Sequence, residues 1–185
     1  DQGHARVFAD QTEALKGQII EALGLMVRQD KRSQVRSAAL ERLASIESAK
    51  ALTAQAAIHA LNQDSSYTVA WAALNALNQA DAEAALRFAE KLRQSESGMI
   101  LESVANIFAS TKKADYDSFF EEAWQRASNN NVANILDTYL TALLDRKDNQ
   151  LLLNKMDFFA NIALNPNNLD WARYGGMSAL KRMLG

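Results

Sequence analysis

The chain has 185 residues, of which 48% are hydrophobic and 23% are charged, the balance of an ordinary globular protein. Its formal net charge of −2 argues against a surface for nucleic acid, because such surfaces usually carry a basic excess. It has no cysteine, which excludes disulfides and thiolate chemistry, and no apolar run approaches the about 20 residues that cross a bilayer.

Apolar residues recur at helical spacing almost from end to end. Positions i, i+3, i+4 and i+7 share one face of a helix, because 3.6 residues complete a turn. No segment shows the apolar-polar alternation of a half-buried strand. The pattern predicts about ten helices of roughly 11 to 17 residues each. In chain order, the expected apolar stripes are 15–26, 35–43, 52–61, 69–77, 82–92, 100–108, 116–127, 132–144, 152–163 and 172–184.

Short polar side chains fill the gaps between these stripes and mark the predicted turns. Serine, aspartate and asparagine cap the first free N–H groups of a helix, so they gather where helices begin. Pro166 falls in such a gap, where it interrupts no helix. The expected turns lie at 30–33, 48, 64–66, 81, 95–97, 115, 129–131, 148–149 and 165–168.

A short apolar pattern occurs twice, as QVRSAALERLASI at 34–46 and as TVAWAALNALNQA at 68–80. One further helical stripe separates the two copies, so the repeating unit is a helical hairpin. One hairpin cannot bury both faces of its apolar stripe, whereas stacked hairpins can. Five positions coincide at one constant offset along the chain: Val35, Ala38, Ala39, Leu40 and Leu43 match Val69, Ala72, Ala73, Leu74 and Leu77.

QVRSAALERL resembles the second helix of a HEAT repeat, in which Val-Arg precedes an Ala-Ala pair and a leucine. TVAWAALNAL fits the same pattern, with Ala70 in place of the arginine. The strong matches cover 30–80, and the remainder fits only as helical hairpins. The resemblance implies that Arg36 pairs with a turn carboxylate, for which Asp30 is the nearest candidate.

The tetratricopeptide repeat, whose period of about 34 residues is similar, is the rival interpretation. Trp71, Leu74 and Asn75 favour that alignment. Its second-helix Ala-x-x-x-Phe would then fall at Ala84 and Phe88, several residues too early. The HEAT-like interpretation is therefore preferred.

The stretch DSSYTVAWAALNALNQADAEAALRFAEKL and the ending NNLDWARYGGMSALKRMLG are similar to the C-terminal helical region of zinc aminopeptidases of the alanyl-aminopeptidase family. In that family a HEAT-like domain follows the catalytic domain and closes over the active site. The zinc site there needs His-Glu-x-x-His, since two histidines four apart ligate one metal. This chain has only His4 and His59, which lie far apart in sequence and outside any such motif, so no zinc is expected within it.

The remaining chemistry-bearing residues have structural interpretations. His59 is expected to be a partly buried structural histidine, and His4 to lie near a flexible end. The carboxylate pairs 115/117 and 121/122 sit near a predicted helix start, where negative charge offsets the helix dipole. The glycines of RYGGM are expected to permit close helix packing, because no strand or Gly-x-Gly-x-x-Gly accompanies them to form a phosphate cradle.

Three surface features have a functional alternative. The basic cluster Arg28, Lys31, Arg32 and Arg36 is interpreted as a solvated turn interrupted by Asp30, and its alternative is a DNA-binding patch. Trp71 is a candidate exposed anchor on a concave surface, since tryptophan buries a large area in one contact. The aromatic set is expected to be core, with a partner groove as the alternative: Tyr116, Phe119, Phe120 and Trp124.

The prediction is an all-α protein, a right-handed α-α superhelix (HEAT/ARM-like solenoid) of about five helical hairpins. Residues 1–185 are expected to form a single HEAT-like domain and, lacking an initial methionine, to be a piece of a longer protein. No catalytic, cofactor-binding or metal residue is assigned. The predicted function is that of a noncatalytic C-terminal domain of a zinc aminopeptidase, which encloses the active-site chamber and limits peptide access. The alternative is a stand-alone protein-protein interaction scaffold.

The expected partners follow from these two functions. They are the catalytic domain of the same parent chain, or a peptide or protein ligand. Neither nucleic acid nor a membrane span is expected.

Overall fold

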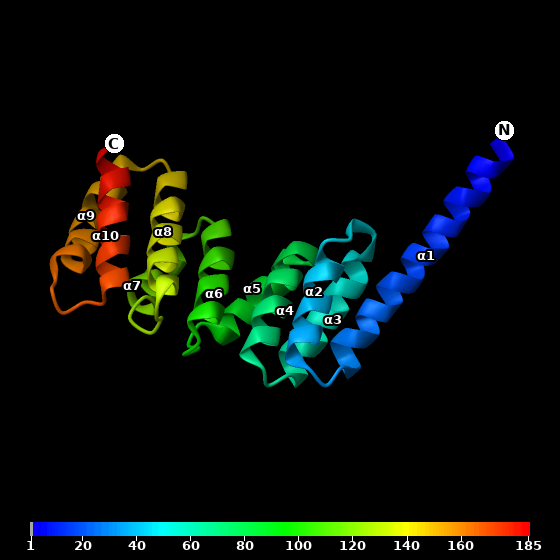
Figure 1. The fold of residues 1–185 in the computed structure, drawn as a ribbon. Helices are drawn as coiled ribbons and strands as arrows, with labels where there is room; N and C mark the ends of the chain where they lie inside the picture. Colours follow the sequence, from blue (N-terminus) through cyan, green and yellow to red (C-terminus); the bar gives the residue numbers. More distant parts are fainter. Residues whose placement is uncertain (1) are drawn as a thin grey trace. The chain divides into compact units, whose positions relative to one another are not determined.

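The structure is a computed structural model that describes residues 2–185, with side chains described from Gln11 onward. Helix makes up 82% of it, and residues 2–185 contain no strand, so the predicted all-α class is confirmed (Figure 1). The α helices are α1 (Gln2–Gln29), α2 (Ser33–Ala44), α3 (Lys50–Gln63), α4 (Tyr67–Ala80), α5 (Ala82–Leu92), α6 (Gly98–Ser110), α7 (Asp117–Ala123), α8 (Asn130–Asp145), α9 (Asn149–Leu164) and α10 (Asp170–Leu184). Two short 3-10 helices, η1 (Glu47–Ala49) and η2 (Ala114–Tyr116), precede α3 and α7.

The chain divides into two compact units, one ending at Ala85 and the other running from Leu86 to Gly185. Helix α5 begins in the first unit and ends in the second. The expectation that 1–185 form one HEAT-like domain stays a prediction.

The first unit consists of two helical hairpins. Helix α1 packs against α2 and α3 packs against α4, while α2 also packs against α4 and α1 against α3. The two copies of the sequence repeat therefore form the two second helices, which lie against each other. Leucines fill this contact, and Leu40, Leu43, Leu74 and Leu77 are completely buried.

Small side chains make up much of the core of the first unit. Ala56, Ala57 and Ala73 are fully buried, and each leaves room for a neighbouring helix to come close. The two copies are not equally covered, because Ala38 in α2 is exposed whereas its counterpart Ala72 in α4 is 1% exposed.

The apolar stripe predicted for the first helix does not face the core. Leu15, Ile19 and Met26 are 57%, 48% and 44% exposed. Helix α1 instead turns Gly24 and Val27 inward, and a Cβ atom at Gly24 would lie 3.3 Å from a methyl carbon of Leu52. The stripe stays open because α1 has partners, α2 and α3, on one flank only.

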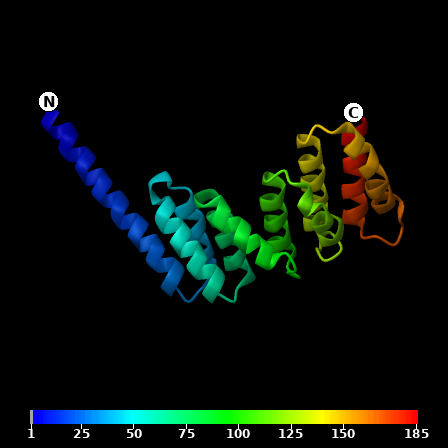
Figure 2. The ribbon, with the colours of Figure 1, turned by 180° about the vertical axis from the view of Figure 1, so that it is seen from behind.

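The second unit has two layers of helices. In one layer α8 packs against both α6 and α10, and in the other layer α7 contacts α8 while α9 packs against α10. Figure 1 shows α6, α8 and α10 side by side, and Figure 2 shows the layer with α9 from behind. The successive hairpins of this unit therefore place their second helices next to one another.

Aromatic rings fill the second unit. The Phe108 and Tyr116 rings stack at 4.0 Å between centroids, and Phe120 stacks on Tyr139 at 4.9 Å. Phe119 meets Phe108 edge to face at 5.0 Å. The core role predicted for Tyr116, Phe119 and Phe120 is thus confirmed, with exposures of 8%, 2% and 1%.

The paired glycines serve close packing, as the sequence predicted. A Cβ atom at Gly175 would lie 2.9 Å from Leu136 Cδ1, on α8. A Cβ atom at Gly176 would lie 2.9 Å from backbone atoms of Phe159 and Ala163, on α9. Helix α10 can therefore touch α8 with one glycine and α9 with the next.

Three polar contacts between neighbouring hairpins of the second unit span 32 or 33 residues. Arg126 donates to the Arg93 carbonyl oxygen at 2.9 Å, and Arg146 donates to the Lys113 carbonyl oxygen at 3.1 Å, each across 33 residues. The Thr138 hydroxyl bonds the side chain of Asn106 across 32 residues. These separations are close to the 34-residue offset between the two copies of the sequence repeat, whereas other contacts between neighbouring hairpins span 29, 41 and 45 residues.

Turn residues act partly as predicted. The Asp81 carboxylate accepts from the Ala84 N–H at 2.9 Å, and the Asp148 carboxylate accepts from the Leu151 N–H at 3.0 Å, so both cap a helix. After α6 and α8 the chain leaves the helix through a left-handed residue, Lys112 with φ 57° and Lys147 with φ 54°.

Candidate functional site

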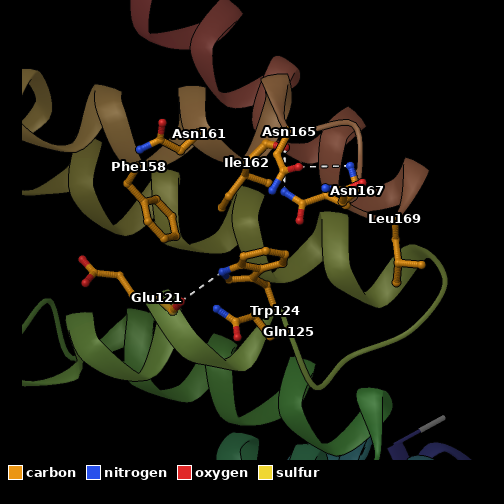
Figure 3. A pocket seen from close by; sticks show the side chains of 10 residues that line it. Glu121, Trp124, Gln125, Phe158, Asn161, Ile162, Asn165, Asn167 and Leu169 are labelled. Carbon is orange, nitrogen blue, oxygen red and sulfur yellow. Dashed lines mark hydrogen bonds between the residues drawn. The ribbon is translucent and has the colours of Figure 1, made fainter.

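A groove of about 750 Å³ lies between α7 and α9 in the second unit (Figure 3). We call it the α7–α9 groove. Helix α7 supplies one wall, α9 the other, and the α9–α10 turn closes one end. The lining residues are Glu121, Trp124, Gln125, Phe158, Asn161, Ile162, Asn165, Asn167, Asn168 and Leu169.

Trp124 lies at the groove because it follows directly after α7. Phe119, Phe120 and Ala123 occupy the buried side of that helix, so Trp124 at its C-terminal end is left half-buried. Its indole Nε1–H donates to the Glu121 carbonyl oxygen at 3.0 Å, which fixes the ring. Trp124 is thus the one member of the predicted aromatic core set that lines a groove.

Phe158 faces the groove from α9 and is also half-buried. Its ring meets Phe159 edge to face at 5.1 Å and Tyr139 at 5.8 Å, so core aromatic residues support it from behind. Figure 3 shows the Phe158 and Trp124 rings on the opposite walls of the groove. The separation of these two positions along the chain equals the offset between the two copies of the sequence repeat.

Glu121 carries the charge of the α7 wall. Its Oε1 accepts from Lys155 Nζ at 2.5 Å and from the Tyr139 hydroxyl at 2.9 Å. Burial raises the pKa of Tyr139, and the hydrogen bond to Glu121 raises it further, so this phenol stays a neutral donor. Glu121 and Lys155 are separated by 34 residues, the offset of the sequence repeat once more, and their ion pair cancels the charge of the groove wall.

Amide side chains form the polar part of the lining. The α9–α10 turn is held by two bonds, Asn168 Nδ2 to the Ile162 carbonyl oxygen and the Asn167 N–H to Asn165 Oδ1, both at 3.0 Å. The side-chain amides of Gln125, Asn161 and Asn167 bond no described residue. They are therefore available to a ligand as both donors and acceptors.

A smaller hollow, of about 280 Å³, lies in the first unit. Its floor is an ion pair in which Arg36 holds Asp64 through two bonds of 2.6 and 3.0 Å, and Arg36 also donates to the Asp30 carbonyl oxygen at 2.8 Å. Arg36 therefore does pair with a turn carboxylate, but the carboxylate is that of Asp64 in the next hairpin. The Asp30 carboxylate, which the sequence suggested, accepts from Arg32 instead. The bond from Arg36 holds the pKa of Asp64 below its ordinary value.

The histidine and the basic cluster meet at this hollow. His59 lines it but is exposed, so the expectation of a partly buried histidine is wrong. It lies on the outer surface of α3, one residue before the buried Ala60. Arg32 and Arg36 are both held by carboxylates, whereas Arg28 and Lys31 bond no other described residue. The side chain of His4 lies outside the described residues.

Two further residues singled out by sequence, Asp117 and Trp71, lie outside the α7–α9 groove. Asp117 holds Arg146 through bonds of 2.6 and 2.9 Å, which ties the end of α8 to the start of α7. Trp71 is half-buried and lines none of the hollows described above. Sequence reasoning missed the α7–α9 groove, although the repeat period, applied to Glu121 and Trp124, would have placed Lys155 and Phe158 beside them.

Comparisons of the chain with protein-family models, with curated proteins and with solved structures each found no match. Among the described residues, no group of three or more histidine and acidic side chains is placed to hold a metal ion. No described helix is both long and apolar enough to cross a membrane.

Proposed function

We propose that this chain is a HEAT-like helical-repeat domain, a right-handed superhelix of about five hairpins, whose role is to bind another polypeptide. The observation that carries the proposal is the parallel course of neighbouring second helices in the second unit. Along α6 and α8, Glu102 bonds Asn131 and, further on, Asn106 bonds Thr138. Both contacts advance in the same direction along the two helices.

The same direction holds for the next pair of helices. Gly175 packs against Ala133 and Leu136 near the start of α8, and Arg182 bonds Asp137 and Thr141 further along it. Up-and-down bundles alternate the direction of neighbouring helices, whereas stacked hairpins repeat the direction of every second helix. The parallel row therefore favours a repeat array.

Repeat arrays present long continuous surfaces made of equivalent positions from successive repeats, and such surfaces suit the recognition of extended polypeptides. In this chain two lining residues of the α7–α9 groove, Trp124 and Phe158, are separated by the repeat offset, and the lining residue Glu121 pairs with Lys155, which lies one repeat offset further along the chain. These positions support a surface that binds an extended polypeptide along the repeat axis.

A displayed library of random short peptides tests the proposed function. The purified chain is immobilised, bound peptides are enriched over several rounds, and the selected peptides are measured by fluorescence anisotropy. We expect enriched families that bind the folded chain and do not bind the heat-unfolded chain. Enrichment no greater than on an empty support would contradict a peptide-binding role.

A second candidate is favoured by the resemblance of 64–92 and 167–185 to zinc aminopeptidases. In this proposal the chain is the noncatalytic C-terminal domain that walls the active-site chamber, and zinc resides in a catalytic domain outside it. The parent coding sequence should then contain His-Glu-x-x-His upstream of Asp1. Deleting the domain should change the cleavage of long peptides more than the cleavage of a single-residue reporter. A parent gene without His-Glu-x-x-His would rule out the aminopeptidase proposal.

A further inference from the structure

We infer that the α7–α9 groove is the site of polypeptide binding and that it accepts an uncharged, extended segment with one bulky apolar side chain between Trp124 and Phe158. This inference rests on the proposed function, because it names the site and the chemistry of the polypeptide. It commits to an uncharged peptide as the occupant. Three properties of the groove support it: the two aromatic rings on opposite walls, the neutralised charge of Glu121 and the free side-chain amides.

The two aromatic rings of the α7–α9 groove favour a ligand with one bulky side chain. The two half-buried rings lie on opposite walls, and the nearly buried Ile162 lies between them and the α9–α10 turn. Leu169, which is 61% exposed, adds apolar surface at the closed end. A leucine, phenylalanine or tryptophan side chain inserted here would be removed from water on two sides, which is the main source of affinity in a groove of this kind.

Charge excludes ionised side chains. Glu121 is the only ionisable residue among those lining the groove, and Lys155 already neutralises it. An ammonium or carboxylate group entering the groove would lose hydration without gaining a counter-charge. The electrostatic complement of this lining is therefore a neutral segment.

Free amides match a peptide main chain. Gln125 lies on the α7 side, and Asn161 and Asn167 lie on the α9 side. Each side-chain amide offers two N–H donors and one carbonyl acceptor, the same pair of functions that an extended main chain presents at each residue. Main-chain bonds on both sides would hold the segment along the groove while the apolar side chain fills it.

The test uses blocked heptapeptides, acetylated and amidated, with serine and asparagine flanks and a varied central residue. Binding to the intact chain is followed by the three tryptophan indole N–H signals in an NMR spectrum, each assigned with a single Trp→Phe variant. We expect peptides with central leucine, phenylalanine or tryptophan to shift the Trp124 signal. Peptides with central lysine or aspartate should bind at least tenfold more weakly.

Two variants locate the site. Trp124→Ala should abolish binding of the central-phenylalanine peptide, and Phe158→Leu should weaken it several-fold. Trp171→Ala is the matched control, because Trp171 is 48% exposed on α10 and lies outside the groove lining. A thermal melt of each variant confirms that it is folded.

The outcomes separate the inference from the proposed function. One contrary result is that library-selected peptides bind Trp124→Ala as tightly as the unchanged protein, and another is that they shift only the Trp71 or Trp171 signals. Either result would show that the groove assignment is wrong, while the peptide-binding role would stand. Equal or tighter binding of the central-lysine or central-aspartate peptides overturns the neutral chemistry. If neither the library nor the heptapeptides yield a binder, both proposals fail.

Discussion

Both compact units consist of packed helical hairpins, but different kinds of side chain fill their cores. In the first unit, buried alanines such as Ala56 and Ala73 bring helices close, and leucines fill the remaining space. In the second, seven aromatic side chains form one connected group of rings, whose members are Phe108, Tyr116, Phe119, Phe120, Tyr139, Phe158 and Phe159. Packed helical hairpins can therefore be built either around small aliphatic side chains or around aromatic rings.

Each unit contains a partly buried arginine–aspartate ion pair: the pair in the first unit joins two hairpins, and the pair in the second unit joins the two helices of one hairpin. Arg36 holds Asp64 across 28 residues in the first unit, and Arg146 holds Asp117 across 29 residues in the second. All four side chains are less than one fifth exposed. Partly buried arginine forks of this kind fix register as well as adding energy, because both bonds of the fork must be satisfied together.

The largest expected effect is in the aromatic unit. Phe120 is 1% exposed and stacks on Tyr139, so Phe120→Ala removes a ring from a close-packed group. We expect the free energy of unfolding, from urea denaturation, to fall by about 3–5 kcal/mol. A loss below about 1 kcal/mol would show that the rings are not a packed core.

The ion pairs come next, and they compare the units directly. Asp64→Asn leaves the Arg36 guanidinium without its counter-charge, and we expect a loss of about 1.5–3 kcal/mol at neutral pH. Asp117→Asn should cost a similar amount in the second unit. A double-mutant cycle that combines Asp64→Asn with Arg36→Gln isolates the coupling free energy between the two side chains. A coupling free energy of zero would show that the ion pair does not stabilise the fold.

The Asp64 pair also gives a pH dependence with a definite sign. The bond from Arg36 lowers the pKa of Asp64 from its ordinary value of 3.8, so the folded chain binds this proton less readily than the unfolded chain. The contribution of Asp64 to stability is therefore complete well above pH 3.8 and is lost as the pH falls below it. Stability measured from neutral to strongly acidic pH should fall less steeply in Asp64→Asn than in the unchanged protein.

The first unit should be sensitive to enlargement. Ala73 is fully buried in α4, so Ala73→Leu adds a branched side chain where no space exists. We expect a loss of about 1–3 kcal/mol. The control is Ala38→Leu in the other copy of the repeat, where the exposed position should tolerate the change within about 0.5 kcal/mol.

The smallest expected effect is a gain. Lys147 follows α8 with φ 54°, a backbone conformation that glycine adopts more readily than any other residue. Lys147→Gly should raise the free energy of unfolding by about 0.4–1 kcal/mol, as judged from the urea midpoint. Lys147→Ala, which keeps the Cβ atom, serves as the control and should give no such gain.

Much of this fold could be predicted from the sequence, because helical spacing and turn chemistry are local. The hairpin period was visible where the Val-Ala-Ala-Leu pattern repeats, at 35–43 and 69–77. No such pattern is visible in the second unit, because positions one offset apart there carry chemically unlike residues, such as Phe119 and Leu153 or Phe120 and Asn154. The stacking of its hairpins became apparent only through contacts such as that between Thr138 and Asn106.

The features that the sequence did not predict all depend on which neighbour a residue meets. The α1 stripe has the right spacing for a core face, yet no described helix covers it. Two turn carboxylates, Asp30 and Asp64, are candidate partners for Arg36 in the sequence, and only the fold shows that Arg36 pairs with Asp64. Trp124 shares its spacing with Phe120, but its place at the end of α7 turns it from the core to the groove.

The parallel stacking of successive hairpins is tested most directly by disulfide trapping, which is clean in a chain without native cysteine. The variant Asn106→Cys/Thr138→Cys joins α6 and α8 at positions whose side chains already touch. Under mild oxidation it should cross-link almost completely. The variant Asn106→Cys/Asp145→Cys shifts the partner by two helical turns along α8, about 10 Å, and should stay reduced. Equal cross-linking of both pairs, or preference for the shifted pair, would contradict the stacking of α6 on α8.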